Sequence, residues 1–355
     1  MINRKTNRPE LASLALLLVP TAALLTQSEA NAPTSTEVSA REAAVTDSES
    51  EEEAIRLAEA SLAVGGRAPL RIDRGKDQLA LFIPRKEELV YEVNVAWGII
   101  GTALGTVTMS SGVEPYKTSL LVPPKSEDEK PGETGWFKAH AYGEHLFYTL
   151  DATLDARHQP TEWPQIVYRS SQGGSENRRR ELLIGMKDGK LTSSYRRDTD
   201  KGAPRGTRIW KEPVYREVPD SVIDMTSAVY LVRTFVARSL ETAKFPVLDK
   251  KELWDMTLSK GGGAQQATPA GTFETVEIIL IAKHYPGEEE RKKKKFEGLF
   301  GLHGGIHLWV DRKTGVPVRI QGEIPAGPIT LSVDISLASF KGTPSALKPI
   351  AAARD

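Results

Sequence analysis

The chain has 355 residues, of which 47 are Lys or Arg, 47 are Asp or Glu and none is Cys. This length is enough to bury a large core in one or two domains. The absence of cysteine excludes disulfides, thiolate zinc sites, iron–sulfur clusters, thiol catalysis and a lipidated N-terminal cysteine. The net charge of zero argues against a dedicated nucleic-acid-binding protein, which normally carries a basic excess.

The first 30 residues have the features of a secretory signal peptide. Basic residues in the first eight positions precede an apolar run over 11–25 and small residues near position 30. Because the run is shorter than a spanning helix and Pro20 interrupts it, an uncleaved anchor is the minor alternative. Cleavage fits after Ala30 or Ala32. We favour Ala30, since the other cut would leave Pro33 first. The missing cysteines then point to the bacterial periplasm, with no transmembrane segment in the mature chain.

Residues 31–65 are predicted to form an acidic, disordered tether. Positions 31–60 hold eight acidic residues and two arginines, a net charge of −6, which leaves +5 for residues 61–355. The segment 31–52 contains no aromatic residue, so it buries too little apolar surface to offset its ordering entropy. A solvated spacer is the simplest interpretation, and a contact site for a protein partner is the alternative.

The body of the chain, residues 66–345, is predicted to be a single β-rich domain, followed by a tail at 346–355. Apolar and polar residues alternate with a period of two, and turn sequences such as Asp188-Gly189 separate the runs. The expected strands, in chain order, lie at 89–95, 99–109, 117–123, 135–141, 145–150, 165–171, 180–186, 190–197, 207–211, 213–218, 243–248, 252–258, 272–284, 305–310, 316–322 and 328–340.

So many short strands predict a mainly β fold, a large antiparallel sheet curled into an open or closed barrel. Residues 221–239 differ, because their apolar residues recur at spacings of three and four and predict one helix. Asp220 or Asp224 would cap this helix. We expect it to cover an open sheet face or to plug a barrel end. Residues 124–134 and 286–304 are expected to be long loops.

No motif predicts a catalytic centre, a metal site or a cofactor. Residues 185–191 have too few residues between their glycines for a phosphate-binding loop, and no Gly-x-Ser-x-Gly elbow is present. His303 and His307 would lie about 13 Å apart on a strand, too far for one metal ion. Glycosidase chemistry needs two carboxyl groups at a separation that sequence alone does not fix. Two carboxylate pairs are interpreted as solvated charge: Glu87 with Glu88, and Asp151 with Asp155.

Two sets of residues are candidates for binding. Aromatic residues on the expected strands either complete the core or line a cavity for an apolar ligand. The ligand-lining candidates are Tyr91, Trp97, Phe147, Trp254 and Trp309. Basic runs lie at 178–180 and 291–295, and either could be a solvated loop or a contact for anionic head groups. The surface-binding candidates are Arg291, Lys292, Lys293, Lys294 and Lys295.

Five motifs follow one another in a familiar order: Leu89-x-Tyr91-x-Val93 with Trp97–Ala103, Leu146–Leu154, Asp224–Arg233, Thr268–Thr275, and Leu308–Asp311 with Val316–Ile320 and Gly327–Ile329. Over roughly residues 80–341 this order resembles the exported bacterial family catalogued as domain of unknown function 3108. Lys86-Glu87-Glu88 departs from the family's usual Gly-Glu. The resemblance implies a periplasmic, mostly antiparallel β protein with one helix, and it supplies no reaction.

These observations lead us to expect a non-catalytic periplasmic envelope protein without a cofactor. Its curled sheet would bind or shield an apolar or amphiphilic, lipid-like ligand or envelope component. One alternative is an envelope scaffold or protein-interaction module, whose protein partners the sequence does not name. Another is a carboxylate-dependent polysaccharide hydrolase, which would require two carboxyl groups about 5–10 Å apart in a groove.

Overall fold

A computed structural model describes residues 70–71, 86–97, 100–115, 133–145, 148–159, 165–174, 178–198, 209–288, 296, 298, 301–326 and 329–342. The predicted signal peptide, the tether, the strand at 117–123 and the C-terminal tail lie outside these residues. So do Phe147, the basic run at 291–295 and most of the two expected loops.

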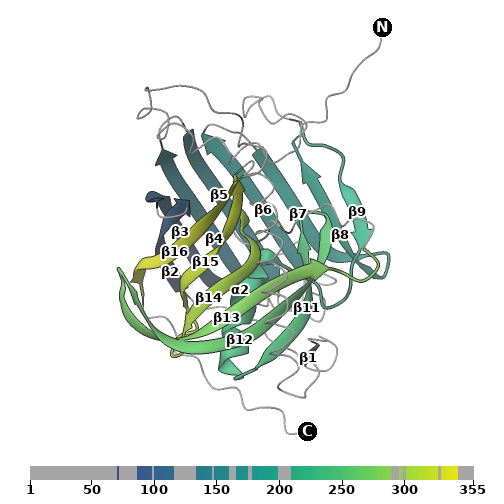
Figure 1. Cartoon of the computed structure of the whole chain (residues 1–355). Coiled ribbons are helices and arrows are strands. Elements are labelled where there is room, and N and C mark those ends of the chain that lie inside the picture. The colour runs from purple at the N-terminus through teal and green to yellow at the C-terminus, as the bar shows by residue number, and fades with distance from the viewer. Residues whose placement is uncertain are drawn as a thin grey trace, which may run out of the picture.

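The described strands belong to one large, mostly antiparallel sheet (Figure 1). Its strands are β1 (Leu70–Arg71), β2 (Lys86–Trp97), β3 (Ile100–Pro115), β4 (Glu133–His145), β5 (Tyr148–Gln159), β6 (Gln165–Gly174), β7 (Arg178–Lys187), β8 (Lys190–Arg197), β9 (Val214–Glu217), β10 (Ile223–Asp224), β11 (Thr242–Asp249), β12 (Glu252–Thr268), β13 (Gly271–His284), β14 (His303–Asp311), β15 (Pro317–Ala326) and β16 (Ile329–Lys341). The predicted mainly β fold is confirmed.

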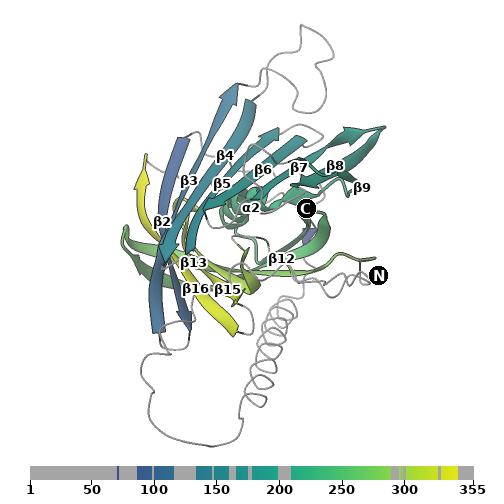
Figure 2. The same cartoon turned by 90° about the horizontal axis from the view of Figure 1, so that it is seen from above.

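The sheet is open rather than closed into a barrel. The strand order is β1-β11-β12-β13-β14-β15-β16-β2-β3-β4-β5-β6-β7-β8-β9. The pairing of β16 with β2 joins the two halves of the sheet, which are β11–β16 and β2–β9. The short strands β1 and β10 depart from the antiparallel pattern, because both pair in parallel with β11. Figure 2 shows the two halves as facing walls with the helix α2 (Met225–Ala237) between them.

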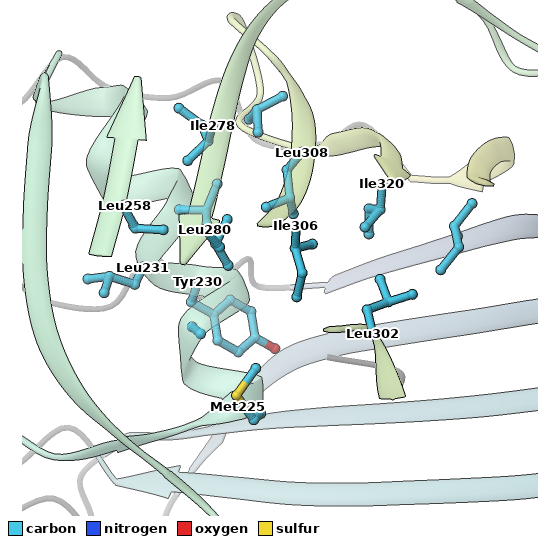
Figure 3. Packing of buried hydrophobic residues seen from close by; sticks show 14 of the residues in the cluster. Met225, Tyr230, Leu231, Leu258, Ile278, Leu280, Leu302, Ile306, Leu308 and Ile320 are labelled. Atoms are coloured by element: carbon cyan, nitrogen blue, oxygen red, sulfur yellow. The ribbon is translucent and has the colours of Figure 1, made fainter. Parts of the chain in front are cut away.

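The main core lies between α2 and the two walls. Alternate residues of each strand point inward, and α2 presents buried residues on most of its surface. Figure 3 shows Tyr230 and Leu231 of α2 beside Leu258 and Leu280 of the opposite wall. The predicted helix is therefore confirmed, and it fills the interior of the curl instead of covering one exposed face.

A second apolar cluster links the free ends of the sheet without strand pairing. Leu182 and Ile184 of β7 pack with Val222, and β11 and β12 contribute Leu248 and Leu253. The burial of these side chains stabilises the curled shape, since apolar contacts hold together two edges that backbone hydrogen bonds do not join.

The strand boundaries differ most from the prediction around β4 and β5. One strand was expected at 145–150, whereas β4 ends at His145 and β5 begins at Tyr148 and continues to Gln159. Polar residues occupy the outward positions of β5, and its inward positions include the small residue Ala156, so the apolar signal in this segment is weak. The expected turn at Asp188-Gly189 is confirmed as a two-residue hairpin turn, with φ of 53° and 78°.

Gly105 and Gly143 lie opposite each other in β3 and β4, and a side chain there would clash with backbone. A Cβ atom on Gly105 would lie 2.2 Å from the Tyr142 carbonyl oxygen. We expect Gly105→Ala to lower the free energy of unfolding by about 1–3 kcal/mol, because the two strands would have to separate. Urea denaturation measures this change.

Gly262→Ala is the matched control, because a Cβ atom at Gly262 in β12 meets no atom within 4 Å. Its unfolding midpoint should stay at the wild-type value. Equal midpoints for Gly105→Ala and Gly262→Ala would contradict the close approach of β3 and β4.

Candidate functional site

A groove of about 560 Å³ lies on the outer face of the sheet, the face turned away from α2 and the core. Sites for small molecules commonly have volumes of 300–1,000 Å³. The described lining residues are Thr108, Ser110, Lys138, Ala139, His140, Thr153, Leu154, Asp155, Arg169, Ser170, Ser171, Arg179, Arg180 and Trp210.

Two neighbouring rows of side chains, running across the strands, build this groove. Residues opposite one another in an antiparallel sheet point to the same face. The first row, across β3 to β7, is Thr108, His140, Thr153, Ser171 and Arg179. The second row, across β3 to β8, is Ser110, Lys138, Asp155, Arg169, Glu181 and Arg196. Ala139, Leu154, Ser170 and Arg180 alternate with these residues along their strands and also border the groove.

Two buried carboxylates hold arginines at the end of the groove near Trp210. Glu181 accepts hydrogen bonds from Arg169 Nε at 2.7 Å and from Arg196 Nε at 2.7 Å. Asp198 accepts from Arg179 Nε at 3.0 Å and from Arg179 Nη2 at 2.8 Å. These carboxylate side chains are 5% and 3% exposed, whereas the Arg169 side chain is 65% exposed. A ligand therefore meets the guanidinium groups rather than the carboxylates.

Trp210 closes this end of the groove. The guanidinium carbons of Arg179 and Arg196 lie 4.4 and 4.6 Å from its ring centroid, within the range of cation–π contacts. Two exposed apolar residues lie close to it in the chain: Ile209 immediately precedes Trp210, and Tyr215 follows on the edge strand β9. Since Tyr215 lies opposite Ser194, it points to the same outer face as the groove. Cationic and apolar surface therefore adjoin.

The other end of the groove carries a histidine and carboxylates. His140 Nε2 lies 2.9 Å from Asp151 Oδ1, and Asp155 pairs with Arg157 Nε at 3.1 Å. Asp155 is the carboxylate among the described lining residues. The sequence interpretation paired Asp151 with Asp155, but the two residues have different partners.

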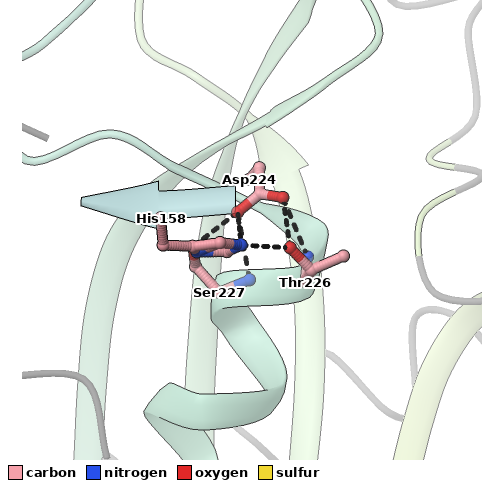
Figure 4. A network of polar contacts seen from close by, with 4 residues as sticks. All are labelled: His158, Asp224, Thr226 and Ser227. Atoms are coloured by element: carbon pink, nitrogen blue, oxygen red, sulfur yellow. Dashed lines mark hydrogen bonds and ion pairs between the residues drawn. The ribbon is translucent and has the colours of Figure 1, made fainter. Parts of the chain in front are cut away.

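A separate polar network, made of histidine, aspartate and hydroxyl groups, lies at the start of α2 (Figure 4). Asp224 caps the helix by accepting from the backbone N–H groups of Thr226 and Ser227. His158 Nε2 lies 2.8 Å from Thr226 Oγ1, and His158 Nδ1 lies 2.9 Å from Ser227 Oγ. All four side chains are buried, so the network anchors the helix and does not face a substrate.

The four ligand-lining candidates that the structure describes do not meet in one cavity. Tyr91 is buried, its hydroxyl donates to the Pro317 carbonyl oxygen at 2.8 Å, and burial raises the pKa of its phenol. Trp254 is buried against His284 and Phe296. The enclosed cavity beside Tyr91 holds about 20 Å³, room for one water molecule.

The other two described candidates are not among the buried core residues, although Trp309 packs against the main core cluster. Trp97 is exposed at the end of β2. Trp309 is half-buried on the outer face of β14, between His307 and Arg319. Phe147 and the surface-binding candidates at 291–295 lie outside the described residues.

Sequence reasoning missed most of the groove residues. Arg179 was noted within a basic run and Asp155 within a carboxylate pair, but their neighbours come from other strands. The available signal was the alternation along each strand, which places Lys138 with His140 and Arg169 with Ser171 on one face. Register across five strands was needed to align them.

Two further features concern the part of the chain that the structure describes. Nowhere in that part of the chain do three or more His, Cys, Asp or Glu side chains gather in a way that could hold a metal ion. None of its helices is long and apolar enough to cross a membrane.

The fold and groove define a mainly β protein with an internal helix and a concave, polar surface on the outside of its sheet. The family described as protein of unknown function (DUF3108) matches residues 136–334, more than half of the chain, and the chain belongs to this family. The crystal structure of a β-barrel-like protein of domain of unknown function DUF1849 from Brucella abortus is similar, with a TM-score of 0.43 and 11% sequence identity. The similarity covers 73% of this chain and 98% of that one. No curated protein matches.

Proposed function

We propose that this protein is an exported, periplasmic component of the bacterial cell envelope that binds an amphiphilic, lipid-like molecule without catalysing a reaction. Export is supported by the basic start, the apolar run over 11–25 and the small residues near Ala30. The head group of the ligand lies in the outer groove.

The observation that carries this proposal is the junction of cationic and apolar surface beside Trp210. Arg169 and Arg179 present positive charge in the groove, Tyr215 is exposed on the same face in the row next to that of Arg196, and Ile209 is exposed one residue before Trp210. A molecule with a polar head and an apolar chain can contact both surfaces at once. A purely polar solute would leave the side chains of Ile209 and Tyr215 in water.

The same geometry favours binding over hydrolysis. A glycosidase of the usual kind needs two carboxyl groups beside the bond that it cleaves. Among the described residues that line the groove, Asp155 alone supplies a carboxylate. Glu181 follows it in the same row, but Glu181 is buried and bound by two arginines.

The proposal predicts that the mature chain, residues 31–355, binds laurate and dodecyl maltoside below their micelle concentrations. Ile209→Asp should weaken both affinities about tenfold, because it places a charge where the alkyl chain is buried. Titration calorimetry gives the affinities, and native mass spectrometry gives the stoichiometry.

Phe340→Asp is the matched control, since Phe340 is also an exposed apolar residue but lies near the end of β16, away from the groove. Its affinities should equal those of the wild type. Absence of binding to either amphiphile, or equal losses in the two variants, would overturn the proposed function.

A further inference from the structure

Building on the proposed function, we infer that the head group bound in the outer groove is a saccharide that carries an anionic substituent. The saccharide lies across the strands, along the two rows of side chains, and its anionic substituent lies at the Trp210 end beside Arg169 and Arg179.

Three of the five side chains in the first row carry a hydroxyl group. Thr108, Thr153 and Ser171 belong to this row, and Ser110 begins the second. Each hydroxyl both donates and accepts hydrogen bonds, as sugar hydroxyls do. Adjacent strands are about 4.8 Å apart, so the row offers a polar contact at each strand that a ring-shaped, hydroxyl-rich ligand crosses.

The second row supplies complementary groups for the same kind of ligand. Asp155 accepts hydrogen bonds from ligand hydroxyls, and Lys138, its neighbour across the strands, donates them. A simple phosphate or carboxylate has no donors for Asp155 and is too short to use the hydroxyl row. This mixture of donors and acceptors therefore favours a saccharide over a small anion.

The accessible charge selects an anionic ligand over a neutral one. The carboxylates that balance the arginines, Glu181 and Asp198, are buried, while the Arg169 guanidinium remains in solvent. Both arginines are held by hydrogen bonds and are therefore oriented before a ligand arrives. Preorganised arginines form strong, charge-assisted hydrogen bonds with carboxylate and phosphate groups.

The test compares three amphiphiles with the same alkyl chain but different head groups. Dodecyl glucuronide has an anionic sugar, dodecyl maltoside a neutral sugar, and dodecyl phosphate an anion without a sugar. Titration calorimetry on residues 31–355 should show dodecyl glucuronide binding at least about tenfold more tightly than the other two.

Each result separates this inference from the proposed function. Equal affinities for the three amphiphiles would overturn the saccharide assignment and leave amphiphile binding intact. Free glucuronic acid binding as tightly as dodecyl glucuronide would support the assignment and overturn the role of the apolar chain. Failure of all ligands to bind would overturn both.

Arg169→Gln removes the exposed cation without leaving Glu181 unpaired, because Arg196 still donates to that carboxylate. This variant should bind dodecyl glucuronide about tenfold more weakly and dodecyl maltoside unchanged. Lys190→Gln is the matched control, as Lys190 is exposed, pairs with Glu217 and does not line the groove. Equal losses in Arg169→Gln and Lys190→Gln would show only a general effect of net charge and would overturn the inference.

Thr153→Val tests the hydroxyl row independently of charge. It should weaken both sugar amphiphiles by about threefold to tenfold and leave dodecyl phosphate unchanged, because valine keeps the shape of threonine and removes its hydroxyl. An unchanged affinity for both sugar amphiphiles would contradict a saccharide lying along this row.

Discussion

Replacing Arg233 by methionine is expected to lower the free energy of unfolding by about 3–5 kcal/mol, because it leaves the Glu87 carboxylate buried without its partner. Arg233 lies in the middle of α2, and its Nη1 and Nη2 atoms donate to the two carboxylate oxygens of Glu87 on β2, at 3.1 and 2.5 Å. The two side chains are only 2% and 4% exposed. Bulk solvent therefore has little access to the carboxylate that is left behind.

The expected loss of stability comes from the Glu87 carboxylate that is left buried without a partner. Removing both charges should therefore restore much of the stability. Glu87→Leu combined with Arg233→Met should unfold closer to the wild type than Arg233→Met alone, since well-packed apolar residues often replace a buried pair at little cost. Urea denaturation of the wild type and both variants measures this.

Lys341→Met is the matched control, because it removes the partner of the neighbouring carboxylate on β2. Lys341 pairs with Glu88, the residue next to Glu87, at 2.8 Å in an exposed position. Exposed pairs contribute little to stability, so this variant should unfold at the wild-type urea concentration. If Arg233→Met also did so, the buried ion pair would not anchor α2 to β2.

Glu87 is also an example of a residue whose structural role could not be predicted from the sequence. The sequence correctly indicated the alternation of β2 and a helix within 221–239, because these patterns repeat along a short stretch of chain. It interpreted Glu87 and Glu88 alike, as solvated charges. The partner of Glu87 lies 146 residues away in the sequence, and no local pattern connects the two.

The helix itself was predicted correctly, but the extent of its burial was not. Spacings of three and four indicated one apolar face, which suits a helix lying on a sheet. The curled sheet instead surrounds α2, so the polar residues Thr226, Arg233 and Thr234 are buried as well. These polar residues are buried because both walls of the curled sheet face the helix. A local periodicity does not predict that arrangement.

The groove was beyond sequence analysis for a related reason. Each of its strands shows which side chains share a face, but not which strand lies beside it or in what register. The pairs Lys138 with Asp155 and Arg169 with Glu181 depend on that register. The charged residues form two rows only when the strands are paired in this register.

The second large effect is expected for Asp224→Ala, which should lower the free energy of unfolding by about 3–4 kcal/mol. An N-cap alone contributes about 1–2 kcal/mol. Asp224 also accepts from the hydroxyls of Thr226 and Ser227, each at 2.5 Å, and all of these groups are buried. Removing the carboxylate leaves several buried donors without an acceptor, and this adds to the loss of the cap.

The alternative cap considered from sequence provides the control. Asp220 is exposed and lies before the helix, whereas Asp224 is the residue that accepts from the backbone N–H groups of Thr226 and Ser227. Asp220→Ala should therefore unfold at the wild-type urea concentration. A large loss for Asp220→Ala, or none for Asp224→Ala, would contradict the assignment of the cap.

Asp224→Asn tests whether both carboxylate oxygens of Asp224 are needed. Oδ1 accepts from the backbone N–H and the hydroxyl of Ser227, and Oδ2 accepts from the backbone N–H and the hydroxyl of Thr226. An asparagine amide keeps the shape of the side chain but has an acceptor at only one of these two positions, so two buried donors would face an amide N–H group. Asp224→Asn should therefore lose most of the stability that Asp224→Ala loses, as measured by urea denaturation, whereas a wild-type unfolding midpoint would indicate that one accepting oxygen is enough.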